Sequence, residues 1–468
     1  MYSNDETKDR HRIAVLVITT ISSFLIPFMA SSVVIALPTI AGYFQMNAVL
    51  ITWVSTAYIL TSASLMVPLG RLSDMHGRKK IFLGGYIIFL AGSLLSVVVQ
   101  SSGLFLFSRV IQGVGASAVV ANSVAILTAA FPKRHRGRVL GINAAAVYIG
   151  LSVSPLLGGL LTEHLGWRSI FFLSAGLCLA MVIATAIMLP EYEEPRRDRF
   201  DLPGTIVYMA TLTLFMYGLS ILPSRMGVSF IAASLCGILL FVRLEKRAAS
   251  PIIDFRLFMQ NRGFAFSNIA ALVHYSGTYS IAFLLSLYLQ FTKGLSAGEA
   301  GLVLITNPII QALFSPIFGR LSDRVEPRLL SSAGMAVTCA GILVLSFLTV
   351  DTKVIHIVGC QVLIGFGFAM FASPNTNAIM SSIEKHSYGF AAATMGTMRQ
   401  LGMTLSMGIA MVVFAIVIGK ETIVSEHQAA FIAGVRLIFT IAAVLCFVAV
   451  FASLARGDIH EQKGLIRR

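Results

Sequence analysis

Long apolar runs, separated by short polar segments, fill almost the whole chain. A helix needs about 20 mostly apolar residues to cross a bilayer. With charge clusters and Pro/Gly breaks as boundaries, the pattern predicts fourteen such spans. They cover residues 13–37, 48–69, 80–100, 103–131, 138–162, 168–189, 202–221, 227–243, 263–291, 298–318, 328–349, 355–379, 388–418 and 430–455.

The composition agrees with a chain that lives in a lipid bilayer. Hydrophobic residues make up 56% of the 468 residues and charged residues 12%, with a mean hydropathy of +0.84. Soluble domains carry roughly 25% charged residues. The chain is therefore predicted to be an all-α, multi-pass protein of the cell membrane.

The positive charge indicates an orientation and not a nucleic-acid partner. The net charge is +14, but the cations lie in short segments between apolar runs and form no basic, aromatic-studded face. Most of the 35 Lys and Arg residues fall in alternate segments that include both termini and the loop at 68–80. The positive-inside rule places these segments in the cytoplasm.

Several other classes of function are disfavoured by what the apolar runs contain. The five cysteines lie inside these runs without CxxC spacing, which argues against a disulfide framework and a zinc site. There is no GxxxxGK[ST] loop, so ATP-driven transport is not expected. We predict no metal site, no cofactor and no enzymatic activity.

An internal repeat divides the chain. Residues 70–74 and 319–323 both read GRLSD, and the glycine pair of "IQGVG" recurs later in "LIGFG". Such self-similarity predicts two similar halves in tandem. We place them at 1–190 and 262–468, each with six helices, and assign 191–261 to an inserted two-helix hairpin.

Three motifs carry a resemblance to a known family. The loop "GRLSDMHGRKK" resembles the signature between the second and third helices of the major facilitator superfamily, and "RVIQGVG" resembles its fourth-helix signature. The run from Gly141 to Gly159 resembles the fifth-helix signature of its antiporters, with Ser154 where glycine is usual. Fourteen spans and "LGWRSIFF" narrow the resemblance to the fourteen-helix drug:proton antiporters. It implies a major facilitator fold of two six-helix halves plus two extra helices between them.

The loop at 68–80 is the best-supported functional feature. The resemblance implies a cytoplasmic latch that locks one conformation by charge pairing and by contact of an acid with a helix N-terminus. The alternative is a solvated loop whose cations only set topology. The conformational-gate candidates are Gly70, Arg71, Asp74, Gly77, Arg78, Lys79 and, in the second copy, Asp323.

Arg109, Gln112 and His274 are the candidates for ion coupling. A guanidinium inside a span costs roughly 2.5–3.5 kcal/mol unless it meets water or a partner. Arg109 could face a central cavity or relay protons, or it could snorkel to the nearby interface. His274 is a histidine well inside a span, where a coupling role and simple packing are both open.

The fifth span carries small residues that let helix backbones approach closely, with a bend at a proline. This arrangement indicates a rocking interface that also seals against leak, or close packing without antiporter meaning. The antiporter-helix candidates are Gly141, Gly150, Ser154, Pro155, Gly158 and Gly159.

Aromatic, methionine and amide side chains inside spans could line a pocket for amphipathic compounds, although such residues often only fill helix bundles. The substrate-binding candidates are Met29, Tyr58, Asn122, Tyr148, Tyr275, Tyr279, Asn307 and Asn375.

The first span departs from the antiporter pattern. The family usually has an aspartate where this chain has Met29, and an asparagine where it has Val34. The acidic residues fall in loops or near helix ends. Proton coupling by a carboxylate at the membrane midplane is therefore unsupported.

The leading hypothesis is a secondary active exporter of small amphipathic or drug-like compounds that works by alternating access, with proton coupling left open. A second hypothesis is a transporter or facilitator of a lipid, metabolite or amino acid without midplane-carboxylate coupling. A third is a non-transporting membrane receptor or assembly factor. The expected partners are a small-molecule substrate and the lipid bilayer, and a monomer is expected.

Overall fold

The computed structural model describes residues 2–131, 136–190, 201–247, 258–259, 261–322, 324–383, 388–419 and 428–457. Fourteen helices in this part of the chain are long and apolar enough to cross a membrane, and no strand occurs there. The predicted number of spans and the all-α fold class are confirmed.

The helices follow the predicted runs and extend several of them by a turn or more. In the first half they are α1 (Tyr2–Phe44), α2 (Ala48–His76), α3 (Arg78–Val98), α4 (Ser102–Ala130), α5 (Arg136–Leu165) and α6 (Arg168–Met188). Two further helices follow, α7 (Leu202–Ser220) and α8 (Arg225–Glu245).

Two spans of the second half are built from consecutive pieces. One combines α10 (Arg262–Thr278), α11 (Ser280–Leu287) and the π-helix η1 (Tyr288–Thr292), and the next combines α12 (Ala297–Leu304) and α13 (Thr306–Leu321). The remaining helices are α14 (Pro327–Leu345), α15 (Val354–Ser381), α16 (Tyr388–Val417) and α17 (Gln428–Leu454).

Local sequence signals explain where helices begin and end. Asn47 and Ser101 accept hydrogen bonds from the backbone amides of Leu50 and Leu104, which caps α2 and α4. Gly77 separates α2 from α3 with φ of 101°, a conformation that suits glycine and few other residues. The glycine of the "MHGRK" turn is therefore required by the backbone.

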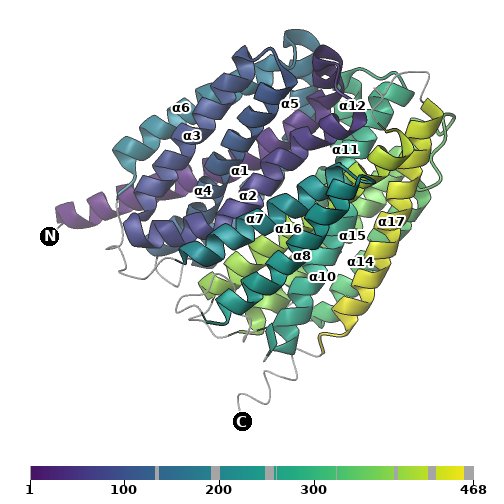
Figure 1. The fold of residues 1–468 in the computed structure, drawn as a ribbon. Helices are drawn as coiled ribbons and strands as arrows, with labels where there is room; N and C mark the ends of the chain where they lie inside the picture. Colours follow the sequence, from purple (N-terminus) through teal and green to yellow (C-terminus); the bar gives the residue numbers. More distant parts are fainter. Residues whose placement is uncertain are drawn as a thin grey trace.

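The two sets of six helices use the same pairing pattern. In the first half α1 packs on α5 and α6, α4 packs on α2 and α3, and α3 packs on α6. In the second half α10 packs on α16 and α17, α15 packs on α13 and α14, and α14 packs on α17. Each helix pair of the first half therefore has its counterpart in the second. Figure 1 shows the helices of the first half, in purple and blue, grouped beside those of the second half, in green and yellow.

The halves meet along a seam with different partners on its two sides. On one side α5 contacts α12 and α13, on the other α2 contacts α16, and α1 contacts α11 between them. The hairpin of α7 and α8 lies beside α2 and α16 (Figure 1), and α7 contacts both helices. Because the span count is even, α1 begins and α17 ends at one end of the bundle, which we call the terminal end; the opposite end is the far end.

Candidate functional site

The predicted gate loop ties together helix ends within the first half. The Asp74 carboxylate pairs with Arg78 at 3.1 Å, and Arg78 also donates to the Ala125 carbonyl of α4 at 3.4 Å. Lys79 donates to the Ala186 carbonyl of α6 at 3.0 Å. These contacts link the α2–α3 turn to two further helices at the terminal end. Gly70 and Arg71 lie in the last turns of α2.

The second copy of the motif repeats one detail of the first. The Ser73 hydroxyl donates to the Gly70 carbonyl at 2.6 Å, and the Ser322 hydroxyl donates to the Gly319 carbonyl at 2.7 Å. Both bonds tighten the end of a helix after its proline. Asp323, the remaining gate candidate, lies outside the described residues, so its contacts stay a prediction.

Arg109 is buried in a polar network and does not snorkel. Its side chain is 2% exposed, Nε donates to the Val54 carbonyl at 3.3 Å, and the guanidinium donates to the Gln112 side chain. Gln112 in turn donates to Ser93 at 3.1 Å. The guanidinium lies 4.7 Å from the centre of the Tyr58 ring, a cation–π contact. These partners offset the cost of placing the charge inside the membrane and bind α4 to α2 and α3.

His274 lies in an aromatic pocket of the second half. Its ring is fully buried, 4.1 Å from the Phe371 ring and 5.3 Å from the Phe368 ring. Neither ring nitrogen has a hydrogen-bond partner among the described residues. A charge on this ring would have no compensation in the conformation seen here. The predicted coupling role of His274 stays a prediction.

Glycines of α5 permit close approach to both halves. A Cβ at Gly150 would lie 2.5 Å from the Phe24 carbonyl oxygen, and a Cβ at Gly158 would lie 2.9 Å from Ser32, both on α1. A Cβ at Gly159 would overlap the Ala297 carbonyl of α12 in the second half. Gly141 has open space beside it. From Gly150 onward this face of α5 contacts α1 and α12 closely, and its role as a rocking interface stays a prediction.

The bend region of α5 also makes specific contacts. The carbonyl of Ser154 accepts a hydrogen bond of 3.2 Å from the Ser32 hydroxyl of α1. The Pro155 carbonyl faces Gly301 of α12 so closely that a Cβ there would overlap it. Ser154, buried in the first half, takes the place of the usual glycine without obstructing this packing.

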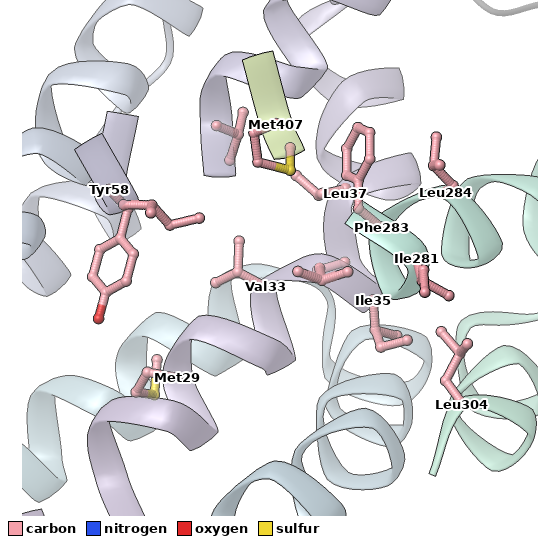
Figure 2. Close-up of a cluster of buried hydrophobic side chains, with 14 of the residues drawn as sticks. Met29, Val33, Ile35, Leu37, Tyr58, Ile281, Phe283, Leu284, Leu304 and Met407 are labelled. Atoms are coloured by element: carbon pink, nitrogen blue, oxygen red, sulfur yellow. The ribbon is translucent and has the colours of Figure 1, made fainter. Parts of the chain in front are cut away.

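Met29 belongs to an apolar cluster that joins the halves toward the far end. Ile35 and Leu37 of α1 lie beside Ile281 and Phe283 of α11 (Figure 2). Val33, Leu284, Leu304 and Met407 belong to the same cluster. Met29 is 1% exposed. An unpaired carboxylate at this position would be costly, which fits the absence of the usual acid.

Polar contacts between the halves accompany this cluster near the far end. The Ser286 hydroxyl donates to the Val34 carbonyl at 2.9 Å, and the Gln290 amide donates to the Ile35 carbonyl at 3.0 Å. The Glu163 carboxylate at the end of α5 accepts from the Ser296 hydroxyl at 2.8 Å and from the Gly298 amide at 2.9 Å. The far end is therefore closed by residues from both halves.

The tyrosine candidates gather around two arginines at the seam. Tyr58 of α2 and Tyr279 of the second half both lie within electrostatic range of Arg109. Tyr275 of α10 hydrogen-bonds with Arg399 of α16 and lies within electrostatic range of Tyr148 of α5. Each group combines side chains from both halves, which the sequence alone could not show.

The asparagine candidates do not share one site. Asn122 donates to the Ala118 carbonyl of its own helix at 2.7 Å. Asn307 accepts a bond of 2.5 Å from Gln311 and donates to Gln361 at 3.4 Å. Asn375 is part of a buried clamp at the terminal end of the second half, where it accepts from Arg456 at 3.1 Å.

Arg456 is one of the residues that sequence reasoning missed. It is fully buried and also donates to Ser267 at 3.2 Å and to the Pro327 carbonyl at 2.9 Å. Burial lowers its pKa to about 10, with Glu326 opposing the shift, so the guanidinium remains charged at neutral pH. The clamp joins α10, α14, α15 and α17.

The sequence also did not predict the contacts of Arg399, Glu163 and Ser296. The available signal for Arg399 was that it is the single arginine inside the span at 388–418.

Comparison with known proteins identifies the class to which this fold and seam belong. The family model described as Major Facilitator Superfamily matches residues 19–244 and 267–467. The chain belongs to this superfamily, and its fourteen spans fit the fourteen-helix drug:proton antiporter type. Like the other members, it is a membrane transporter by family and fold.

The chain is similar in sequence to three known transport proteins and in fold to one solved structure. The chain is 30% identical to the riboflavin transporter RibZ of Clostridioides difficile, covering 93% of this chain and 95% of the relative. It is 31% identical to the cephamycin export protein CmcT of Amycolatopsis lactamdurans, with 95% and 94% covered. It is 29% identical to the multidrug resistance protein Stp of Mycobacterium tuberculosis, with 86% and 75% covered. A bacterial homologue of the human lysosomal transporter Spinster shares the fold, with a TM-score of 0.71, 16% identity, and 95% and 97% coverage.

Proposed function

We propose that the chain is a secondary exporter of small amphipathic compounds that works by alternating access. The main support for this proposal is the closed far end, where α1 and α5 of one half contact α11, η1 and the start of α12 of the other. Ser286, Gln290 and Glu163 make the polar contacts there. Few hydrogen bonds between described residues join the halves there. The close glycine contacts between α5 and α12 provide surfaces that can separate and meet again. Two packed halves with such a seam suit a rocking motion.

The orientation and the division of the chain are parts of the same proposal. Both termini and the gate loop face the cytoplasm, so the far end faces outward and is closed in this conformation. The units are 1–190 and 262–468, with the hairpin 191–261 beside the seam. The repeated helix pairings and the contacts of α7 with α2 and α16 support this division.

Export of drug-like compounds rests on the relatives and on the seam. CmcT and Stp are named for export and multidrug resistance. The partly exposed Tyr148, Tyr275 and Tyr279 provide aromatic surface between the halves. We assign substrate contact to these three tyrosines, with Asn307 at the edge. Met29, Tyr58, Asn122 and Asn375 are assigned supporting positions because their side chains are buried.

The name of RibZ favours a second candidate, a transporter or facilitator of a metabolite without proton coupling by a midplane carboxylate. The two candidates differ in substrate class and in coupling. For the first candidate, export, we propose coupling to protons through His274. Arg109 and Gln112 would bias the positions of the neighbouring helices.

The test uses purified protein in proteoliposomes and a panel of fluorescent aromatic amphiphiles. Phenyl, naphthyl and pyrenyl bodies are each supplied as carboxylate, amide and ammonium derivatives. We expect at least one compound to stabilise the protein against thermal unfolding and to accumulate in vesicles with a gradient imposed. A protein that binds and moves none of the panel would contradict the proposed export function.

A further inference from the structure

Arg399 is an intramembrane cation whose hydrogen bonding is incomplete. It lies on α16 about 16 Å along the helix from Tyr388, taking a rise of 1.5 Å per residue, and so sits well inside the span. Its Nε is buried and has no hydrogen-bond partner among the described residues. No ion pair joins Arg399 to a carboxylate in the described part of the chain.

The contrast with Arg109 shows what is missing. Arg109 is satisfied by the Val54 carbonyl, by Gln112 and by the face of the Tyr58 ring. Arg399 has the Tyr275 hydroxyl as its hydrogen-bonding neighbour and is only partly buried. An arginine held inside a membrane usually pairs with another group or marks a pathway.

The surroundings of Arg399 provide further contacts of a kind that an amphiphile would use. Tyr275 hydrogen-bonds with Arg399, and Tyr148 of the first half lies within electrostatic range of Tyr275, so phenol groups from both halves are present in this region of the seam. The Phe368 ring lies 5.5 Å from the Tyr275 ring in an edge-on arrangement and is partly exposed. The set therefore combines one cation, two hydroxyl donors and an aromatic wall.

We propose that Arg399, Tyr275 and Tyr148 form a binding site for the carboxylate of an amphipathic aromatic compound. This inference rests on the proposed function and specifies its substrate class as anionic. The guanidinium provides paired donors that match a carboxylate. Tyr275 and Tyr148 donate to the remaining lone pairs, and Phe368 contacts the ring of the compound. Because the donors come from both halves, an occupied site would report on their relative position.

The test compares charge variants of one aromatic body. Binding of naphthylacetate, naphthylacetamide and naphthylethylammonium is measured by thermal stabilisation and by competition in nanodiscs of phosphatidylcholine. We expect the wild type to bind the carboxylate about tenfold or more tightly than the amide, as charge-assisted hydrogen bonds allow. Arg399→Gln should weaken carboxylate binding by about tenfold more than amide binding, so that this preference is lost. Arg399→Lys should keep part of it.

A matched control is Arg436→Gln. Arg436 is another arginine inside a span, but it donates to the Ser346 carbonyl of its own half at 3.1 Å. We expect the carboxylate preference to survive this change. The correct assembly of each variant is checked by amide binding and by elution as a single species.

The outcomes separate this inference from the proposed function. If no member of the panel binds the wild type, both fail. If carboxylate, amide and ammonium bind alike, or if Arg399→Gln weakens carboxylate and amide equally, the anion site alone is overturned. Competition by phosphatidylglycerol in the nanodiscs would reassign the site to a lipid phosphate and also overturn the small-molecule carboxylate.

Discussion

Glu163 of the first half accepts a hydrogen bond of 2.8 Å from the hydroxyl of Ser296 in the second half. The same carboxylate oxygen accepts from the Gly298 amide, so it sits at the N-terminus of α12. Ser296 caps this helix together with Glu299. This contact joins a helix end of one half to a helix start of the other.

Weakening this contact should favour opening of the far end. Glu163→Gln removes the charge that faces the α12 N-terminus but keeps an acceptor for Ser296. We expect Ser286→Cys, introduced as a reporter under the closure, to react about two- to fivefold faster with an impermeant thiol reagent in the Glu163→Gln background. Glu299→Gln, on the same helix turn but bonded within its own half, is the comparison. Equal labelling in all backgrounds would remove Glu163 from the gate.

Substitution of two glycines of α5 should show that close contact with the second half occurs at one position and not at the other. Gly159→Ala would push against the Ala297 carbonyl, and we expect it to destabilise the closed form by about 1–3 kcal/mol. Gly141→Ala has open space and should be neutral or slightly stabilising, because alanine favours a helix over glycine. Thermal unfolding in detergent measures both. A Gly141→Ala variant as unstable as Gly159→Ala would contradict the packing described.

The gate loop should matter for turnover more than for binding. Asp74→Asn breaks the ion pair with Arg78 and should sharply reduce transport, with expression and substrate binding largely intact. Lys80→Gln removes a neighbouring exposed charge and should have little effect. Initial transport rates and binding of the same panel compound, measured for both variants, separate an effect on turnover from an effect on binding. Unchanged transport in Asp74→Asn would reduce the loop to a topology signal.

Topology can be tested at the same loop. Ser73 is 2% exposed and would react poorly, whereas His76 is exposed at the end of α2. In a cysteine-free background, His76→Cys should be labelled by an impermeant reagent in inside-out vesicles only. Labelling in intact cells would reverse the proposed orientation.

Proton coupling can be tested at His274. Histidine is the side chain that titrates near neutral pH without perturbation. We expect either that His274→Gln makes transport insensitive to a pH gradient, or that the wild type is already insensitive. Proteoliposomes with ΔpH and Δψ imposed separately distinguish these outcomes. Strong ΔpH-driven transport that persists in His274→Gln would contradict both and would point to an edge carboxylate such as Glu163.

The membrane spans were predictable because each helix must cross the bilayer. This requires a continuous run of about 20 mostly apolar residues, which is visible in the sequence. The repeat was equally readable, and Ser73 and Ser322 make equivalent bonds in the two copies. Glu163 and Ser296 were not readable as a pair, because neither residue type nor spacing encodes a contact between helices so distant in the chain. Arg399 was visible as an intramembrane cation, but its neighbours depend on how the halves meet. Arg456 follows the last span and reads there as an ordinary flanking cation.

The most direct test of alternating access is to lock the far end by cross-linking. In a cysteine-free background, Glu163→Cys and Ser296→Cys are joined across the halves by a short, reducible bifunctional reagent, since their native side chains touch. Ser23→Cys and Asn143→Cys, whose native side chains bond at 2.8 Å within the first half, form the matched control. We predict that the cross-half link abolishes transport of a panel compound and that reduction restores it, while the control link leaves transport intact. Full transport with the cross-half link in place would contradict alternating access through this end.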